Sequence, residues 1–359
     1  MAKVRLGIIG CGMIVDMKFT AAFKAVPEIE IKSVCDLVEE KASAMRDKLG
    51  AANYYTDYNE MLADPEIDAV LVTTPHPYHA APVVACAKAG KHILCEKPMA
   101  VSLAEVDAMI EAATENKVKL IVMPFYESAA FLTCKRAVEE DWIGPVNSAE
   151  VYTSNQGYPP FAWYLSKQAG VGCIADIGIY SLTPLMALMG PAAAVSALTA
   201  ISSPMATLPN GTEAPLELED KAQITLKYDD GRLATAHSGW AHGMGGSHVM
   251  LYGPKGALAL HGWGCDNLYY RPKDKTQVQD RIKDLPVEKR FGEEWFKVDS
   301  AKIGMGTAAV RSLVEAIQDN RDLSQVLQMH RSVMEIILKG YESAAKGGCP
   351  VALDTKFSL

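Results

Sequence analysis

The stretch Val4-Arg5-Leu6-Gly7-Ile8-Ile9-Gly10-Cys11-Gly12-Met13-Ile14-Val15 decides the fold of the first part of the chain. A short apolar run ends in the pattern Gly-x-Gly, and helical spacing follows over residues 16–26. Glycines at a strand–helix junction permit a tight turn and let the backbone approach a pyrophosphate, which the start of the helix then faces. Val15 stands where a third glycine would complete this fingerprint. The pattern predicts a dinucleotide site whose loop comprises Gly10, Gly12, Met13 and Ile14.

Short apolar strands alternate with helices through the first 124 residues. Helices are expected at 16–26, 39–49, 79–89 and 103–116, and strands at 4–9, 29–35, 69–72, 92–95 and 120–123, the last counted as the sixth of its sheet. Ser102 followed by Glu105 is the capping-box pattern of a helix start. This alternation predicts an α/β domain over residues 1–124 with a doubly wound parallel sheet, the Rossmann architecture.

The pattern changes after Pro124. Helices are expected at 128–140 and 177–189, and strand follows strand from 217 to 270 with turn signals between them. Two helices near 305–319 and 323–346 come last. We expect residues 125–359 to form a substrate-binding and oligomerisation domain of the α+β class, built on a large, mainly antiparallel open sheet. A pocket is expected at the junction between the two domains.

Composition excludes several classes of protein. With 49% hydrophobic and 22% charged residues, the 359-residue chain has ordinary globular values. Its net charge of −8 argues against nucleic acid as a partner. No apolar run reaches the ~18 residues of a membrane span, and the first residues lack the features of a secretory signal. The eight cysteines form no Cys-x-x-Cys pair, so we expect a cytoplasmic protein without a metal site, a disulfide framework or a membrane partner.

The cofactor predicted from the second strand is NAD(H). Asp36 ends that strand, 24 residues after Gly12. A carboxylate there accepts hydrogen bonds from ribose hydroxyls and repels the 2′-phosphate of NADP. Leu37 and Val38 follow, and no adjacent arginine is present to bind such a phosphate.

Two further motifs follow the fourth and fifth strands. They are Thr73-Thr74-Pro75-His76-Pro77-Tyr78-His79 and Cys95-Glu96-Lys97-Pro98. Together with Gly-x-Gly and Asp36, in this order, they resemble the glucose–fructose oxidoreductase / inositol dehydrogenase / rhizopine-catabolism (Gfo/Idh/MocA) family. Later, residues 170–180 resemble the family's glycine-rich stretch followed by Asp-x-Gly-x-His, and residues 252–258 resemble its sheet turn. The resemblance therefore covers nearly the whole chain.

The resemblance implies a NAD(H)-dependent oxidoreductase that takes hydride from a secondary hydroxyl of a sugar, glycoside or cyclitol. The favoured position is C3 of a pyranoside, as in a glycoside 3-dehydrogenase. It also implies that the Lys97–Pro98 peptide bond is cis. Cofactor contacts are expected from Gly10, Gly12, Met13, Ile14, Asp36, Thr74, Pro75, His76, His79, Glu96 and Lys97.

The same resemblance places Lys97, Asp176 and Tyr180 together as the catalytic group. Asp176 and Tyr180 are four residues apart and therefore share one face if the segment is helical. A phenol ionises readily only near a positive charge, which Lys97 can supply, or Lys97 can itself take the proton. The sequence leaves these two alternatives open. Substrate contacts are expected from Lys97, Trp163, Asp176, Tyr180 and His242.

Three positions depart from the family pattern. His76 stands where the family usually has Asn, and Val171 replaces the middle glycine of a Gly-Gly-Gly run. Tyr180 occupies the usual catalytic histidine position. Tyrosine there is similar to the glucose–fructose oxidoreductase and the dihydrodiol/xylose dehydrogenase branches.

Three other functions remain open at this stage. The protein could oxidise one sugar and reduce another with a tightly bound NAD(H). It could be a redox glycosidase, in which transient oxidation at C3 permits elimination and releases an aglycone. The protein could also belong to a class other than enzymes, as a non-catalytic NAD-binding regulator. Such a regulator would not require Lys97, Asp176 and Tyr180 together. Because one face of the large sheet needs covering, we also expect a homodimer or homotetramer.

Overall fold

The computed structural model describes residues 3–274, 287–290, 295–298 and 303–358. The chain forms two compact units. The first comprises Met1–Phe125 and Gly304–Met334, and the second comprises Tyr126–Ile303 and Glu335–Leu359. The first unit thus ends next to the predicted boundary at 124. It also includes Gly304–Met334, which the sequence analysis assigns to the second domain.

The described part of the first unit contains a six-stranded sheet in the order β3-β2-β1-β4-β5-β6, with every neighbouring pair parallel. The strands are β1 (Val4–Ile9), β2 (Ile29–Cys35), β3 (Asn53–Tyr55), β4 (Ala69–Val72), β5 (His92–Cys95) and β6 (Leu120–Val122). The order confirms the expected doubly wound sheet. It reverses between β1 and β4, and ligands of such sheets bind beyond the strand ends at this switch point.

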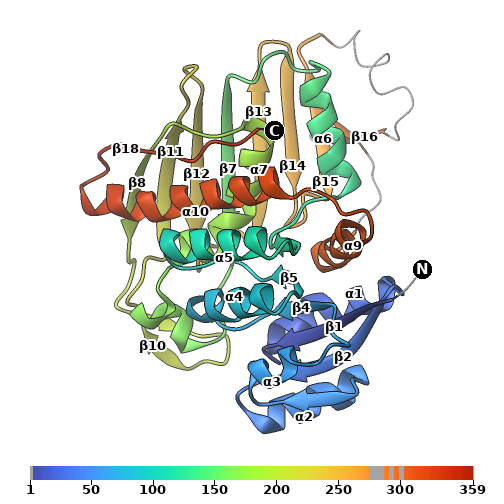
Figure 1. The fold of residues 1–359 in the computed structure, drawn as a ribbon. Coiled ribbons are helices and arrows are strands. Elements are labelled where there is room, and N and C mark those ends of the chain that lie inside the picture. Colours follow the sequence, from blue (N-terminus) through green and yellow to red (C-terminus); the bar gives the residue numbers. More distant parts are fainter. Residues whose placement is uncertain (1–2, 275–286, 291–294, 299–302, 359) are drawn as a thin grey trace. The chain divides into compact units, whose positions relative to one another are not determined.

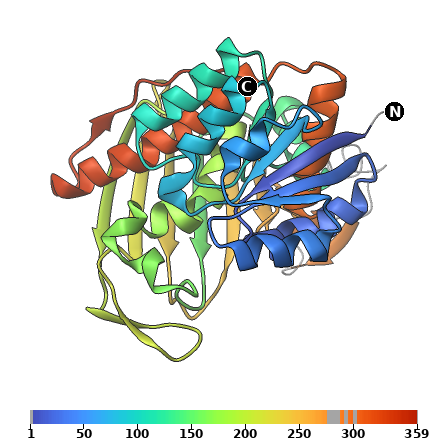
Figure 2. The same ribbon diagram turned by 60° about the horizontal axis from the view of Figure 1, so that its bottom comes forward.

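Helices lie on both sides of this sheet, as the blue part of Figure 2 shows. They are α1 (Thr20–Ala25), α2 (Glu39–Leu49), α3 (Tyr58–Leu62), α4 (Ala80–Lys88), α5 (Leu103–Glu115), α9 (Met305–Gln318) and the first part of α10 (Ser324–Ala345). Two short helical turns precede α1 and α4: η1 (Val15–Phe19) and η2 (His76–Tyr78). Ser102 caps α5 as predicted, because its hydroxyl oxygen accepts the Glu105 N–H at 3.3 Å.

The first unit's core explains why α9 belongs to it. Ile8 and Leu71 from the sheet, Phe19 from η1 and Leu313 from α9 share one buried apolar cluster. Gly306 of α9 lies so close to the backbone of η1 that a Cβ there would overlap the Lys18 carbonyl. An apolar stripe from the late helix therefore completes a core begun by the first strand, which local sequence patterns do not reveal.

The second unit is built on a large mixed sheet. Its described strands run in the order β16-β17-β15-β14-β13-β7-β12-β11-β8-β18. Every pair is antiparallel except β7 with β12, so the prediction of a mainly antiparallel sheet is confirmed. The strands are β7 (Ser148–Ser154), β8 (Ala194–Ala200), β11 (Lys221–Lys227), β12 (Leu233–Gly239), β13 (Gly246–Gly253), β14 (Gly256–His261), β15 (Asn267–Pro272), β16 (Val287–Arg290), β17 (Trp295–Val298) and β18 (Val351–Ala352). A separate hairpin pairs β9 (Met205–Thr207) with β10 (Glu213–Pro215).

Helices of the second unit pack on one face of this sheet. Figure 1 shows α7 (Ile179–Met189) in front of the green and yellow strands, and it contacts β7 and β13. α6 (Ala129–Glu139) contacts β14 and β15. The turns η3 (Ala162–Leu165), η4 (Lys167–Ala169) and η5 (Ile174–Gly178) lead into α7. Along β11, buried and non-buried residues alternate, as expected of a sheet that buries one face.

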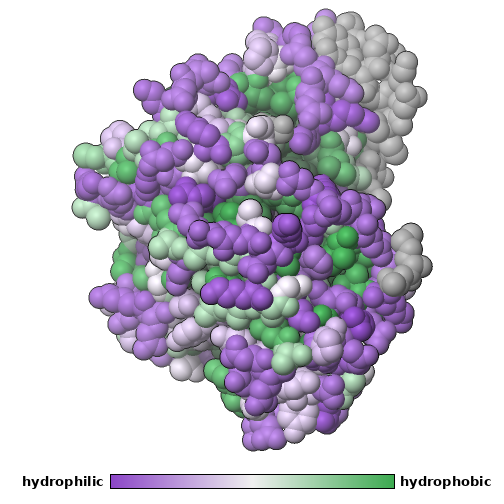
Figure 3. Space-filling view, viewed as in Figure 1, coloured by the Kyte–Doolittle hydropathy of each residue, from purple (hydrophilic) through white to green (hydrophobic). Residues whose placement is uncertain are grey.

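Hydrophilic side chains cover most of the face seen in Figure 3, with apolar residues in groups between them. Among the helices that the structure describes, none is both long enough and apolar enough to cross a membrane.

Candidate active site

The loop after β1 has the geometry that the Gly-x-Gly pattern predicts. Gly10 adopts a φ of +98°, and a Cβ there would lie 2.8 Å from the backbone of Thr73. The Thr73 hydroxyl donates to the Gly10 carbonyl at 2.6 Å, which joins the ends of β1 and β4. A Cβ built on Gly12, in contrast, meets no atom within 4 Å. The space next to Gly12, at the start of the helix, is therefore unfilled by protein atoms, and a pyrophosphate could approach the loop backbone there.

Asp36 lies beside this loop. Its Oδ2 accepts the Cys11 N–H at 2.9 Å, and its Oδ1 accepts the Val38 N–H at 3.0 Å. These two bonds fix the carboxylate at the end of β2, next to the turn. The glycine cradle and the fixed carboxylate together fit the pyrophosphate and the ribose of a dinucleotide.

His79 connects the two predicted cofactor loops. Its side chain is fully buried, with Nδ1 2.7 Å from the Pro98 carbonyl oxygen and Nε2 2.8 Å from the Thr74 carbonyl oxygen. Burial lowers the pKa of the imidazole. The two ring nitrogens thus face backbone carbonyls of the loop after β4 and of the loop after β5, and the expected cofactor contact of His79 stays a prediction. His76, at the start of η2, is also buried.

Glu96 of the Glu-Lys-Pro motif is engaged within the protein. Lys18 Nζ donates to both carboxylate oxygens, at 3.0 and 3.1 Å, and the Lys97 N–H donates to Oε2 at 3.1 Å. The two side chains of the ion pair are largely buried, with exposed fractions of 16% for Lys18 and 4% for Glu96. Glu96 therefore joins η1 to the loop after β5, and its expected cofactor contact stays a prediction.

Lys97 follows Glu96 and is itself buried. Its peptide bond to Pro98 is cis, as expected. Lys18, which the sequence analysis did not single out, is the residue that fixes this motif from the opposite end of the unit's sequence. In the sequence, Lys18 is marked only by its place in the first turns after the Gly-x-Gly pattern.

Asp176 and Tyr180 lie in the second unit, at the start of the buried helix that combines η5 and α7. Each is 6% exposed. The predicted helix there is confirmed, although its first turn is a π-helix, a local widening that is frequent at functional sites. Trp240 Nε1 donates to Asp176 Oδ2 at 3.0 Å, and Trp240 is fully buried.

Aromatic side chains hold the Tyr180 segment. The Tyr126 hydroxyl donates to the Tyr180 carbonyl at 2.6 Å, and the Trp263 ring meets the Tyr180 ring edge-on at a centroid distance of 5.3 Å. Trp163 stacks on Tyr164 at 3.9 Å and is partly exposed. Tyr126, Trp240 and Trp263 thus contact the site residues, although the sequence analysis assigns no role to them.

His242 is not brought to Asp176 or Tyr180. Its Nε2 lies 3.4 Å from His237 Nε2, and its Nδ1 lies 3.4 Å from the Tyr152 hydroxyl. His237 and Tyr152 alternate with residues of β12 and β7 that face η5 and α7, so their side chains point to the opposite face of the sheet. His242 contacts these two side chains and therefore lies with them, and its expected substrate contact stays a prediction.

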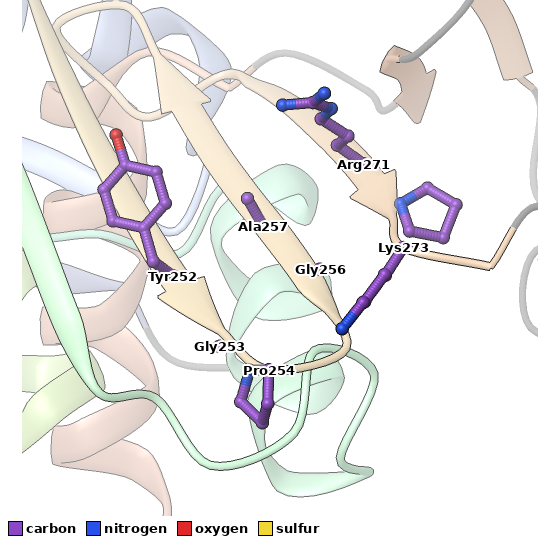
Figure 4. A pocket seen from close by; sticks show the side chains of 8 residues that line it. Tyr252, Gly253, Pro254, Gly256, Ala257, Arg271 and Lys273 are labelled. Carbon is purple, nitrogen blue, oxygen red and sulfur yellow. The ribbon is translucent and has the colours of Figure 1, made fainter.

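A cavity of about 370 Å³ lies elsewhere, at the β13–β14 turn and the end of β15 (Figure 4). None of the residues predicted for the active site lines it; the lining residues are Tyr252, Gly253, Pro254, Gly256, Ala257, Arg271, Pro272 and Lys273. Within the described residues, no group of three or more His, Cys, Asp or Glu side chains is arranged to hold a metal ion.

Several curated relatives are named as dehydrogenases of sugars or cyclitols. A myo-inositol 2-dehydrogenase of Thermotoga maritima is 33% identical over 190 residues, and the match spans 52% of this chain and 55% of that protein. A levoglucosan dehydrogenase of Pseudarthrobacter phenanthrenivorans is 25% identical over 307 residues, 77% of this chain and 76% of that protein.

Solved structures share the fold over nearly the whole chain. A levoglucosan dehydrogenase in complex with NADH and levoglucosan has a TM-score of 0.83 at 22% identity, covering 98% of this chain and 100% of that chain. An aldose-aldose oxidoreductase from Caulobacter crescentus has a TM-score of 0.80 at 23% identity, covering 98% of this chain and 100% of that chain.

Both units match the same family. Residues 4–123 match the oxidoreductase family described by a NAD-binding Rossmann fold, and residues 131–259 match the Gfo/Idh/MocA C-terminal domain. The chain therefore belongs to the Gfo/Idh/MocA family of oxidoreductases, and its first unit carries the family's NAD-binding Rossmann fold.

Proposed function

We propose that this protein is a NAD(H)-dependent dehydrogenase that oxidises a secondary hydroxyl of a sugar, glycoside or cyclitol. The observation that carries the proposal is the pair Asp176 and Tyr180, nearly buried on one helix, with Asp176 held in place by Trp240. Polar groups with fixed orientation are what a hydroxyl-rich substrate requires for recognition. The NAD-binding fold of the first unit and the printed activities of the relatives support the same class of reaction.

The cofactor residues of the proposal are Gly10, Gly12, Met13, Ile14 and Asp36, with Thr74, Pro75 and His76 at the loop after β4. When bound, the nicotinamide of NAD accepts the hydride. Gly10 lets the loop pack against Thr73, Gly12 leaves the loop backbone accessible to phosphate, and Asp36 accepts hydrogen bonds from the ribose hydroxyls. Lys97 is proposed to contact both cofactor and substrate.

Loss of hydride requires that the hydroxyl proton also leaves. We assign this proton to Tyr180 or Lys97, and we assign to Asp176 the orientation of a substrate hydroxyl. Trp163 is proposed to offer a ring face to the sugar, because it is partly exposed beside Tyr164. Tyr180→Phe separates the two bases, since it abolishes turnover if the phenol is the base and reduces it only in part if Lys97 is.

The experiment that tests the function has two steps. The purified protein is first denatured, and any released nucleotide is identified by mass and stoichiometry. The native protein is then supplied with NAD and a panel of inositols, aldoses and glycosides, and NADH absorbance is followed. NADH formation with one substrate class supports the proposal and identifies the class, whereas aglycone release would point to a glycosidase.

Absence of turnover with the whole panel, in both directions and with any released nucleotide restored, would sink the dehydrogenase assignment. Oxidation at C3 is the finer proposal, and it predicts 3-oxo products by mass spectrometry and NMR. Products oxidised at another carbon would contradict that position while leaving the class of enzyme intact.

The open face of the large sheet is proposed as a contact between copies of this chain. It presents one side chain from each of four neighbouring strands: Gln223, His237, Tyr152 and His248. Tyr152 stacks between the rings of His237 and His248 at 5.0 and 5.1 Å. Light scattering that gives the mass of a dimer or tetramer supports this proposal, and a monomeric mass contradicts it.

A further inference from the structure

The helix that carries Asp176 and Tyr180 begins without a capping side chain of its own. Its N-terminal residues are Gly172, Cys173 and Ile174, and none caps the first turn with a side chain. The first N–H groups of a helix lack partners within the helix, and burial makes such groups costly to leave unsatisfied. Cys173 and Ile174 are fully buried, so water does not reach them readily.

Two residues that are distant in the sequence, Glu219 and Tyr341, supply the missing partners. The Ile174 N–H donates to Glu219 Oε1 at 3.2 Å, and the Cys173 N–H donates to the Glu219 carbonyl at 3.2 Å. The Gly172 N–H donates to the Tyr341 hydroxyl at 3.0 Å, and that hydroxyl donates to Glu219 Oε1 at 2.7 Å. Three consecutive N–H groups are therefore satisfied by one Glu and one Tyr, from the segment before β11 and from α10.

Steric fit ties this cap to the sequence. A Cβ at Gly172 would overlap the carboxylate of Glu219, so the third residue of the stretch 170–172 must be glycine for the carboxylate to reach the helix. Glu219 is itself buried. Because the buried carboxylate of Glu219 fits closely against the helix N-terminus, it fixes the position of the helix start in addition to stabilising it.

We infer that Glu219 is a positioning residue, whose carboxylate, together with Tyr341, fixes the start of the helix and thereby the placement of Asp176 and Tyr180. The inference rests on the proposed function, because it concerns the two side chains assigned to substrate there. Asp176 follows the capped turn directly, and its own N–H donates to the Gly172 carbonyl at 3.0 Å. A shift of Gly172 therefore moves Asp176.

Several ionisable groups lie around the Glu219 carboxyl group and influence its pKa. Tyr341 faces it from α10, Cys173 faces it from the helix start, and Asp220 and Lys221 are its neighbours along the chain. Among the residues that the structure describes, no basic side chain forms an ion pair with it. Burial raises the pKa of Glu219 to about 7, against hydrogen bonds from Tyr341 and Ile174 that lower it.

The test compares Glu219→Ala, Glu219→Gln and a matched control, Glu335→Gln. Glu335 is another buried carboxylate of the second unit that accepts N–H groups, those of Asp354 and Thr355, and it holds the C-terminal segment instead of the helix. We expect Glu219→Ala to lower kcat for the sugar about 10-fold or more, since small misplacement of catalytic groups has effects of this size. Glu219→Gln keeps an acceptor for Ile174 and resembles the neutral carboxyl group, so we expect it to recover most of the loss below pH 7.

Two readouts separate this inference from the proposed function. Hydrogen exchange measured by mass spectrometry is expected to accelerate in the peptide covering 172–180 in Glu219→Ala and to stay unchanged there in Glu335→Gln. Kinetics are expected to show a lower kcat with an unchanged KM for NAD. Unchanged exchange in Glu219→Ala overturns the cap, and faster exchange with normal kcat overturns the positioning role. If the unmodified protein oxidises no sugar, the proposed function fails, and exchange alone then decides whether Glu219 holds the helix.

Discussion

The indole Nε1 of Trp240 donates to Asp176 Oδ2 at 3.0 Å, and both residues are nearly inaccessible to solvent. Trp240 is fixed in turn at its backbone, because its N–H donates to the Asp220 carbonyl at 2.9 Å and its carbonyl accepts Lys221 Nζ at 2.5 Å. A rigid donor of this kind gives the Asp176 carboxylate one defined orientation.

Trp240→Phe removes the donor and keeps an aromatic ring. Leaving a buried acceptor without its partner costs ~1–3 kcal/mol, so we expect kcat/KM for the sugar to fall roughly 10- to 100-fold. The KM for NAD is expected to be unchanged. Trp142→Phe is the matched control, since Trp142 is also buried and its Nε1 donates to Glu140 Oε2 at 3.0 Å. Equal effects of the two substitutions on turnover would contradict a specific role of Trp240.

Lys97→Ala is expected to abolish turnover and to leave NAD binding nearly intact, because Lys97 is assigned to the reacting centre and the loop glycines to the phosphates. Calorimetric titration with NAD and steady-state kinetics measure the two effects. Lys91→Ala is the control: Lys91 is also buried in the first unit, but its Nζ donates to the carbonyls of Asp64 and Ile67. Normal turnover in Lys97→Ala would remove Lys97 from the mechanism.

Much of the first unit follows from local sequence, and the reasons can be stated. Parallel strands are short apolar runs, and their carboxyl ends must lie at one edge, so Gly10, Asp36 and Thr74 could be assigned to one cofactor region from the order of strands alone. The strand Asn53–Tyr55 was counted but not placed, since three residues without an apolar run carry little signal. Residues 16–19 belong to the predicted helix 16–26, but Val15–Phe19 forms a π-helical turn, which the spacing of apolar residues does not distinguish from an α-helix.

The contacts that hold the site residues could not be predicted in this way. Lys18 and Glu96 are 78 residues apart, Asp176 and Trp240 are 64 apart, and Glu219 and Tyr341 are 122 apart. Each depends on which elements become neighbours in the fold, and a single sequence contains no periodic pattern for that. His242 shows the same limit, because its sequence position beside Trp240 suggested one site while the sheet turns it towards His237.

Asp36→Asn tests the choice of cofactor. The substitution keeps the shape and removes the charge, and a hydrogen bond to a charged group contributes about 1.5–3 kcal/mol. We expect the KM for NAD to rise roughly 10- to 100-fold and the discrimination against NADP to decrease. Asp57→Asn is a control, since Asp57 caps α3 through the Asn59 N–H and is not assigned to the cofactor. An unchanged ratio of the two cofactors in Asp36→Asn would contradict the ribose assignment.

Lys18→Met tests the ion pair behind the Glu-Lys-Pro motif. It leaves the Glu96 carboxylate buried without its cation, and loss of one partner from a buried pair costs ~3–5 kcal/mol. Urea denaturation is expected to show this loss of stability. Lys346→Met provides the contrast, because the pair Lys346–Glu342 has exposed fractions of 59% and 45%, and such surface pairs contribute about 0–1 kcal/mol. Similar small effects of both substitutions would show that Lys18 does not stabilise the motif.

Glu219 gives the protein a pH dependence of defined sign. Its pKa is raised from an ordinary 4.5 to about 7 in the folded state, chiefly by burial. A group with a raised folded pKa stabilises the fold fully below its unfolded pKa, and this contribution is lost as the pH rises towards 7. The shift corresponds to roughly 3 kcal/mol.

Because other carboxylates titrate in the same range, the measurement is the difference in unfolding free energy between the protein and Glu219→Gln, taken at pH values below 4.5 and above 7. We expect Glu219→Gln to gain stability relative to the unsubstituted protein as the pH rises across this window. A difference that stays constant with pH would mean that the pKa of Glu219 is the same in the folded and the unfolded protein, and it would contradict the raised pKa.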